Sequence, residues 1–232
     1  MAGFPNAGEV GSDSLGNTRA GTGALNPQTT GTSNTAAGTN ALYSNTSGTS
    51  NTAVGANVLY SNTSGDDNVA AGASALLYNT SGIYNVAVGV NALYSNTTGN
   101  YNVAVGCDAG YTATPANATT TGQYQTLVGY QAGQASPTQQ DYILALGANT
   151  TVGASGAVAI GTDSTGTGAT TSITDAIALG TANHQVQLFN NVTGTGSAAL
   201  GANCPAVTVT APYTWLKMLS GDGSTVYVPA WK

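Results

Sequence analysis

Charged side chains are scarce in this sequence of 232 residues: Asp, Glu, Lys and Arg make up 5% of it, against about a quarter of an average soluble domain. Its only Lys and Arg residues are Arg19, Lys217 and Lys232, and the net charge is −6. Nucleic acids and anionic membrane surfaces are bound by clusters of such residues. We therefore expect no nucleic-acid partner and no electrostatic attachment to a membrane.

Cysteine and long apolar runs are equally scarce. Cys107 and Cys204 lie far apart in the chain and fit no metal-ligand or redox spacing. We expect both to be small buried residues; the alternative is one disulfide between them. No apolar run approaches the ~20 residues of a membrane-spanning helix, and the first residues lack the basic and apolar regions of a signal peptide. The sequence predicts neither membrane insertion nor secretion through a cleaved signal.

Side chains suited to catalysis are few. His184 is the only histidine, and its neighbours Asn183 and Gln185 are neither carboxylates nor nucleophiles. Asp66 and Asp67 form the only acidic pair and fall in a turn, where solvated Asp is common. The calcium-binding nonapeptide of β-rolls is missing. We predict that the protein is not an enzyme and that it has no catalytic residues, metal site or cofactor.

What the sequence has in abundance is a repeat of 17 residues that begins at Asn17. Each of six units starts with Asn and has Gly four positions later, and five of them have Leu eight positions after the Asn. The columns are Asn17, Asn34, Asn51, Asn68, Asn85 and Asn102; Gly21, Gly38, Gly55, Gly72, Gly89 and Gly106; and Leu25, Leu42, Leu59, Leu76 and Leu93. A spacing this strict is typical of repeat architectures.

The repeat is too short for helical units, which take about 33 to 47 residues. Each unit holds two short apolar segments, such as Val86–Val88 and Ala92–Tyr94, and the first alternates as a strand does. Gly and β-branched residues would destabilise a helix, by up to about 1 kcal/mol for each Gly. We predict an all-β chain in which each unit is one coil of a parallel β-solenoid. Leu would be buried, Gly would permit close backbone approach, and Asn would bond along the stack.

Beyond Gly106 the spacing loosens but the strand motif returns at residues 126–129, 144–147, 158–161, 177–180 and 198–201. We predict four regions. Residues 1–16 form an N-terminal attachment or cap segment, 17–111 the regular solenoid, 112–204 an irregular solenoid with variable loops, and 205–232 a C-terminal β cap. The last region alternates as a β-hairpin would and contains both tryptophans.

Asn also opens a recurring turn, Asn-Thr-Ser-Gly or Asn-Thr-Thr-Gly, at Asn45, Asn62, Asn79 and Asn96. These tetrapeptides match glycosylation sequons, but Asn and Thr at this period favour turn-stabilising ladders. The Thr column that follows raises the alternative of an ice-binding surface. A second parallel Thr column is missing, which argues against it.

Tyrosine forms two columns. Tyr43, Tyr60 and Tyr94 share one, and Tyr84 and Tyr101 share another, just before the Asn of the repeat. We expect stacked aromatic rings at the edges of the coils or between chains. The alternative is a platform for sugar rings, with Tyr43, Tyr60 and Tyr94 as candidate glycan contacts.

The segments Val158-Ala-Ile-Gly161, Ile177-Ala-Leu-Gly180 and Asn-Val-Ala-Val-Gly at 85–89 and 102–106 resemble the head repeats of trimeric autotransporter (YadA-like) adhesins. The resemblance implies a left-handed parallel β-roll, three copies of which associate around one axis. A homotrimer also fits the small core, which leaves Val and Tyr exposed on a single chain. The ending from Trp215 to Trp231 resembles the ends of small virion proteins of tailed bacteriophages.

These resemblances predict a structural virion protein, a trimeric tail or head fibre or capsid decoration that adheres to the host surface. Its partners would be two further copies of itself, other virion proteins and a host-surface glycan. The signal sequence, heptad stalk and membrane barrel of autotransporters are not found in the sequence, which favours a particle assembled in the cytoplasm. The alternative is a fragment of a bacterial surface adhesin.

Overall fold

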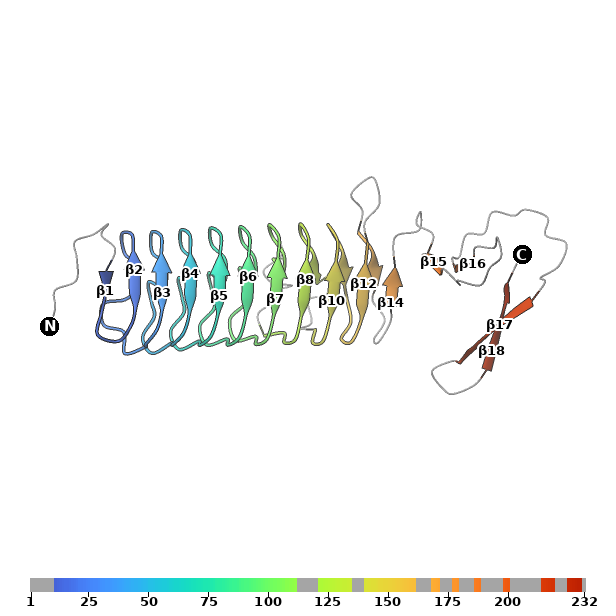
Figure 1. Ribbon diagram of the computed structural model, residues 1–232, viewed down its shortest axis with the longest axis horizontal. Coiled ribbons are helices and arrows are strands. Elements are labelled where there is room, and N and C mark those ends of the chain that lie inside the picture. Colours follow the sequence, from blue (N-terminus) through green and yellow to red (C-terminus); the bar gives the residue numbers. More distant parts are fainter. Residues whose placement is uncertain are drawn as a thin grey trace. The chain divides into compact units, whose positions relative to one another are not determined.

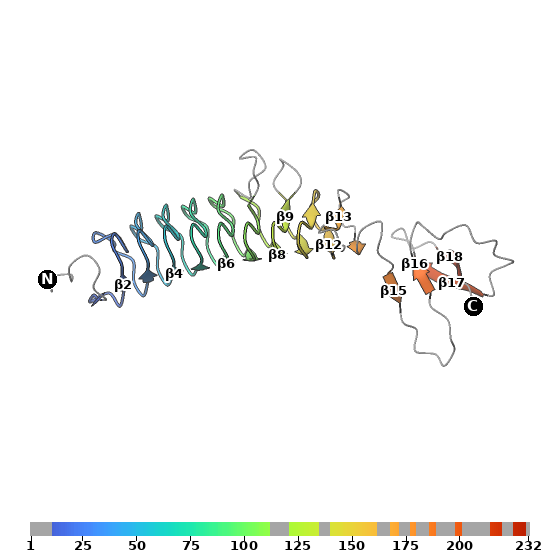
Figure 2. The same ribbon diagram turned by 90° about the horizontal axis from the view of Figure 1, so that it is seen from above.

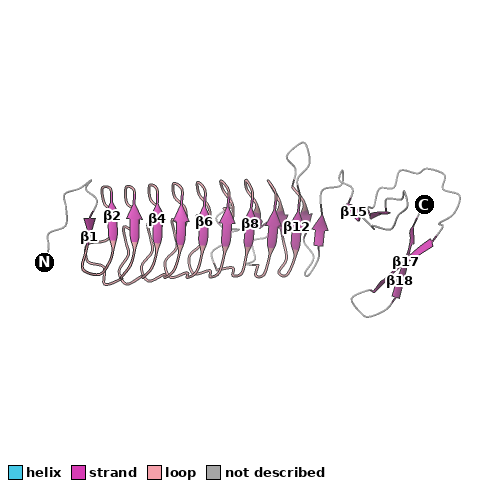
Figure 3. Cartoon of the chain, in the orientation of Figure 1, coloured by secondary structure: helices cyan, strands magenta, loops and turns pink. Residues whose placement is uncertain are grey.

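The computed structural model describes residues 11–111, 121–134, 140–161 and 168–171, together with the strands at 177–179, 186–188, 198–200, 214–219 and 225–230. Residues 1–10, the first large insertion at 112–120, His184, Cys204 and Trp231 lie outside the described residues. The chain divides into two units, Met1–Thr181 and Ala182–Lys232. Strands and connecting loops make up the described parts, and no helix is found among them (Figure 3).

The first unit is built on one sheet of eleven described strands, which follow one another along the stack in chain order (Figure 1). The first strand, β1, is antiparallel to β2, and every later strand is parallel to its neighbour. This confirms the predicted all-β parallel solenoid with one repeat unit per coil. The strands are β1 (Gly11–Ser12), β2 (Thr18–Ala20), β3 (Thr35–Ala37), β4 (Thr52–Val54), β5 (Val69–Ala71), β6 (Val86–Val88), β7 (Val103–Val105), β8 (Thr126–Val128), β10 (Leu144–Leu146), β12 (Val158–Ile160) and β14 (Ile177–Leu179).

From β3 to β12 each strand of this sheet has one inward side chain between two outward ones, because side chains alternate along a strand. The inward residue is Ala in most coils and is fully or almost fully buried. Its small size suits a thin coil, whose opposite wall lies close to the sheet. These inward residues are Ala36, Ala53, Ala70, Ala87, Ala104, Leu127, Ala145 and Ala159.

The second apolar segment of each regular coil is a turn and not a strand. Its Leu side chain is buried, but its backbone is left-handed, with φ between 49° and 54°. An L-residue in this region is disfavoured by roughly 1–2 kcal/mol. Burial of a Leu side chain stabilises by about 1.5–3 kcal/mol, which is enough to hold this conformation. The residues are Leu25, Leu42, Leu59, Leu76 and Leu93.

The position after each strand requires Gly, because its φ is positive and because a Cβ there would collide with the next coil. Gly72 has φ +127°, and a Cβ there would lie 2.5 Å from the carbonyl oxygen of Gly89 in the next coil. Gly129 repeats this geometry in the irregular coils, with φ +134° and a Cβ position 2.6 Å from Gly147. No L side chain fits such a place without moving the backbone of the next coil.

A second parallel sheet forms in the later coils, from β9 (Gly133–Gln134), β11 (Thr151–Val152) and β13 (Thr170–Thr171). Figure 2 places β9 and β13 across the stack from β8 and β12. These coils therefore have two walls of strand, whereas the regular coils have one.

The second unit contains two antiparallel pairs. β15 (Val186–Leu188) pairs with β16 (Ala198–Leu200), and β17 (Thr214–Leu219) pairs with β18 (Thr225–Ala230). The expectation that 198–201 forms a further coil is wrong, because this motif joins an antiparallel pair and not the parallel stack. The side chains of Trp215 and its neighbours lie outside the described residues, so the capping role of 205–232 stays a prediction.

Candidate functional site

The inner Asn ladder, defined as Asn17, Asn34, Asn51, Asn68, Asn85 and Asn102, runs inside the stack just before each strand. Every member is at most 1% exposed. The Oδ1 of Asn51, for example, accepts from the backbone N–H of Asn68 at 3.1 Å and from its Nδ2 at 3.0 Å. The same Nδ2 donates to the carbonyl oxygen of Gly82 at 2.8 Å. Buried amides are stable only when paired in this way, so the ladder ties neighbouring coils together.

Asp13 ends this ladder at the N-terminal side. Its Oδ1 accepts from the backbone N–H groups of Leu15 and Asn17, both at 2.9 Å, and its Oδ2 accepts from the Nδ2 of Asn17 at 3.0 Å. Partial desolvation would raise the pKa of Asp13, but the bonds from Asn17 and Leu15 and the charge of Arg19 together lower it. Asp13 thus replaces the Asn that a preceding coil would supply.

Gln125 ends the ladder at the other side. Its backbone N–H donates to Asn102 Oδ1 at 3.0 Å and its Nε2 donates to the carbonyl oxygen of Gln140. The Oε1 of Gln125 is buried and has no hydrogen-bond partner. The next coil has Ile143 in this column, which offers no side-chain donor.

A second ladder, the turn Asn ladder, joins Asn45, Asn62, Asn79 and Asn96. Each of these side chains is fully buried, and Nδ2 of one coil donates to Oδ1 of the preceding coil at 2.8 Å. Asn buried and paired in this way offers no free amide for a glycan. The neighbouring Thr hydroxyls also bond between coils, for example Thr46 Oγ1, which donates to the carbonyl oxygen of Thr63 at 2.8 Å.

The exposed part of the stack that bears most on function is its outer face, defined as the outward side chains at the first and third positions of β2 to β12. From β4 to β8 each strand has one exposed valine, and the five are 37–46% exposed. They lie in two columns: Val69 is at the first position of β5, whereas the third position of the other strands holds Val54, Val88, Val105 and Val128. Ala71 of β5 interrupts the second column. In β2 and β3 the same positions hold Thr and Ala. A contiguous apolar surface of this kind marks an interaction site.

The tyrosines predicted as glycan contacts fall into two separate groups. The rings of Tyr43 and Tyr60 stack at 5.1 Å with an interplanar angle of 2°. Tyr94 instead lies edge-on to Tyr78 and Tyr111, at 5.1 and 5.4 Å. Tyr43, Tyr60 and Tyr94 therefore share a sequence column but form no single platform, because Leu77 occupies the column between Tyr60 and Tyr94.

A longer stack is formed by the tyrosine ladder, defined as Tyr84, Tyr101, Tyr124 and Tyr142. Successive ring centroids are 5.1, 5.0 and 4.9 Å apart, with interplanar angles of 12°, 3° and 4°. All four side chains are 42–65% exposed. The sequence pattern related only Tyr84 and Tyr101, since insertions break the 17-residue spacing before Tyr124 and Tyr142. What the four tyrosines share is their position, two residues before the start of a strand.

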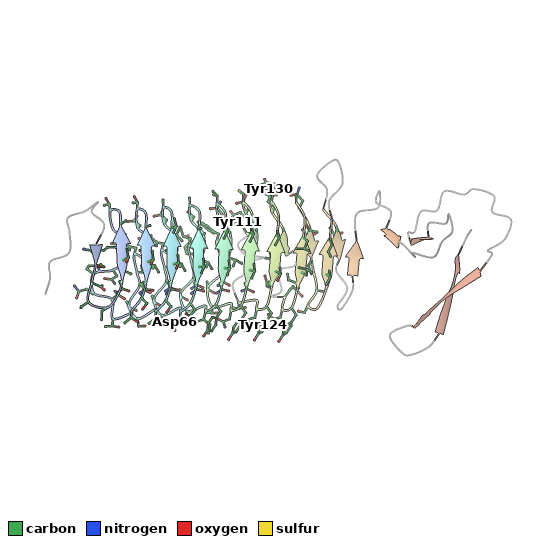
Figure 4. The ribbon with its side chains drawn as sticks, viewed as in Figure 1. Asp66, Tyr111, Tyr124 and Tyr130 are labelled. Atoms are coloured by element: carbon green, nitrogen blue, oxygen red, sulfur yellow. The ribbon has the colours of Figure 1, made fainter. Side chains whose placement is uncertain are left out.

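The tyrosine ladder lies at the edge of the stack where the strands begin, and Tyr124 projects there beyond the ribbon, whereas Tyr130 lies at the opposite edge (Figure 4). Asp66 belongs to the same edge as Tyr124 (Figure 4), and its Oδ1 accepts from the backbone N–H and the hydroxyl of Thr49. The negative charge of Asp67 comes first among the causes that raise the pKa of Tyr84, followed by desolvation.

Cys107 is exposed, so the expectation that it is buried is wrong. It follows Gly106 at the end of β7, in the outward column that holds Val90 and Tyr130, both also exposed. Desolvation and the charge of the adjacent Asp108 raise the pKa of the Cys107 thiol. Cys204 lies outside the described residues, as does His184.

Within the described ranges, no three His, Cys, Asp or Glu side chains come together in a way that could hold a metal ion. The same ranges contain no helix of the length and apolarity needed to cross a bilayer. Comparison with known proteins finds no matching family model, no matching curated protein and no matching solved structure.

Proposed function

We propose that this protein is a structural, non-enzymatic fibre, a homotrimer of left-handed solenoids displayed on the particle of a tailed bacteriophage. It would serve as a tail fibre, a head fibre or a capsid decoration that adheres to the host surface, and 205–232 would form its cap. The observation that carries the proposal is the outer face, where each strand from β4 to β8 has one exposed valine. An apolar surface exposed over successive coils marks an interaction site.

Two further copies of the same chain suit the outer face best. Its side chains recur once per coil, at the ~4.8 Å spacing of neighbouring strands. A second solenoid of the same pitch can match this surface coil by coil. Cyclic symmetry closes such contacts without leaving an open end, and three copies would place the outer faces around one axis.

The hydrogen-bonded interior supports a mechanical role. Asn17 to Asn102 and Asn45 to Asn96 form two ladders that connect successive coils from within. Each coil contacts mainly its neighbours, as in other repeat proteins, and the array is extended by adding coils. The longer and unequal sequence intervals between the strand motifs after Gly106 would supply variable loops, which on a rigid scaffold are common recognition sites.

Sedimentation equilibrium tests the trimer. Three chains of 22.8 kDa are expected, and a monomer at micromolar concentration would contradict the proposal. The double variant Val88→Asp, Val105→Asp places charges on the outer face and should dissociate the trimer. The matched control is Val90→Asp, since Val90 is 47% exposed but lies beyond the strand; it should stay trimeric.

Mass spectrometry of purified virions tests the phage assignment. The chain is expected at a copy number divisible by three, and its absence from the particle would remove the assignment. A bacterial surface adhesin is the alternative, which the same resemblance to YadA-like heads supports. Cell fractionation separates the two, because an adhesin would be recovered from the bacterial surface in uninfected cells.

A further inference from the structure

The tyrosine ladder is held in place before any ligand arrives. The backbone N–H of each tyrosine donates to a carbonyl oxygen of the preceding coil, as Tyr124 does to Asn100 at 3.1 Å and Tyr142 to Gln123 at 3.0 Å. The residue before Tyr124 is fixed as well, since the N–H of Gln123 donates to Asp141 Oδ1 at 2.8 Å. Side chains on a backbone ordered in this way lose little entropy on binding.

The backbone of the ladder is one that tyrosine disfavours. All four tyrosines have a left-handed conformation, with φ between 55° and 58°. Earlier coils fill the same column with Ser33, Ser50 and Asp67, at φ 55–59°, and small polar residues adopt this region more readily. Solenoid coils therefore form without tyrosine here. Strained backbone positions cluster at binding sites, and here the side chains are exposed, so burial does not offset the strain as it does for the Leu turns.

The chemistry of the ladder indicates the class of ligand. Each inner ring is covered on both faces by its neighbours, so the rings present their edges and their hydroxyl groups to solvent. The result is a row of phenol hydroxyls about 5 Å apart, one per coil, at the rim of the stacked rings. Tyrosine combines an apolar body with a polar tip and suits ligands that are amphipathic themselves.

The charges near the tyrosine ladder narrow the class of ligand further. The net charge is −6, and Asp67 and Asp141 lie beside the two ends of the ladder. An anionic polymer would be repelled there, whereas a neutral one would not. We propose that the tyrosine ladder binds a linear neutral glycan that runs along the stack, with about one sugar ring for each coil. This proposal rests on the proposed adhesive function and assigns the binding site for it to the tyrosine ladder.

A second copy of this chain is the other possible occupant, and the position of the ladder argues against it. The valines that would contact a partner belong to the outer face of the strands, while Tyr124 projects from the edge at which the strands begin (Figure 4). A partner seated on the outer face leaves that edge accessible. The ladder and the trimer contact are therefore expected to respond to different substitutions.

The test is binding of the full chain to immobilised neutral oligosaccharides of two to eight sugars: gluco-, manno-, galacto- and N-acetylglucosamine series, with a sulfated polysaccharide for comparison. At least one neutral series should bind, and its affinity should rise with length until about four sugars, one for each tyrosine. The double variant Tyr101→Ser, Tyr124→Ser should weaken that binding at least about tenfold. Serine is chosen because Ser33 and Ser50 occupy this column in earlier coils.

Tyr130→Ser is the matched control, since Tyr130 is 50% exposed but lies at the opposite edge; it should bind as the unmodified chain does. Circular dichroism checks that all variants fold. Unchanged binding in the double variant would overturn the ladder as the site and leave the adhesive fibre standing. A loss of the trimer in the double variant would assign the ladder to the contact between copies. If an intact trimer binds none of the neutral oligosaccharide series, the glycan proposal is refuted and the proposal of a trimeric fibre stands.

Discussion

Asn102 and Gln125 occupy the same inward column in adjacent coils, and the solenoid is built differently on their two sides. Up to Asn102 the column is polar, and hydrogen bonds connect its members at 17-residue intervals. After Gln125 the column is apolar, with Ile143 and Ala157 buried in it. Hydrogen bonds require fixed geometry, whereas apolar contacts are non-directional. Apolar contacts therefore adapt more readily to coils of unequal length, while the bond from the Gln125 N–H to Asn102 Oδ1 is kept across one longer coil.

The largest effect is expected from substitution of a Gly that follows a strand of the long sheet, compared with a Gly of the second sheet, which only the later coils contain. Gly72→Ala places a Cβ against Gly89 at φ +127° and should destabilise by about 3 kcal/mol or more, from left-handed strain and overpacking together. Gly133→Ala, in β9, would put its Cβ 3.6 Å from Gly110, an ordinary contact. Urea denaturation followed by circular dichroism should show a large loss for the first and little change for the second. Equal losses of stability in Gly72→Ala and Gly133→Ala would contradict the expected difference between the two positions.

A smaller difference is expected within the inward column. Asn68→Ala removes the acceptor of the Asn85 backbone N–H and one of the two acceptors of Asn85 Nδ2. It also leaves the carbonyl oxygen of Gly82 with Asn79 Nδ2 as its remaining side-chain donor. Each buried group left unpaired costs about 1–3 kcal/mol. Gln125→Ala removes one side-chain bond and an oxygen that already has no partner, so it should destabilise less. Denaturation midpoints of the two variants, measured side by side, give the comparison. A larger effect at Gln125 would show that the apolar coils depend on it.

The smallest effect concerns the N-terminal end of the polar column. Because hydrogen bonds lower the pKa of Asp13 in the folded chain, its contribution to stability is present above the unfolded value near 3.9. That contribution is lost as the pH falls through the lowered pKa. Between pH 5 and pH 2, the denaturation midpoint should fall slightly more for the unmodified chain than for Asp13→Asn, which does not titrate. Parallel curves would mean that the Asp13 carboxylate has no such role.

The sequence predicted the coils because their columns are exact in spacing from Asn17 to Gly106. It did not reveal that Leu42 and its equivalents are in turns, since a buried Leu is compatible with a strand and its φ of 53° leaves no trace in the sequence. The sequence pattern did not predict that Tyr124 and Tyr142 belong to the same ladder, for another reason. The spacing from Tyr101 to Tyr124 is longer than one repeat, and only the parallel pairing of β7 with β8 restores the register.

Asp13 and the antiparallel strand β1 close one end of the array without depending on how many coils follow. Inside the array each bond of the inner Asn ladder joins residues 17 apart. A duplication or deletion of seventeen codons therefore yields a longer or shorter rod with every column still aligned. Replication errors between neighbouring copies of the repeat would thus change the reach of the molecule in steps of one coil, while both of its ends stay the same.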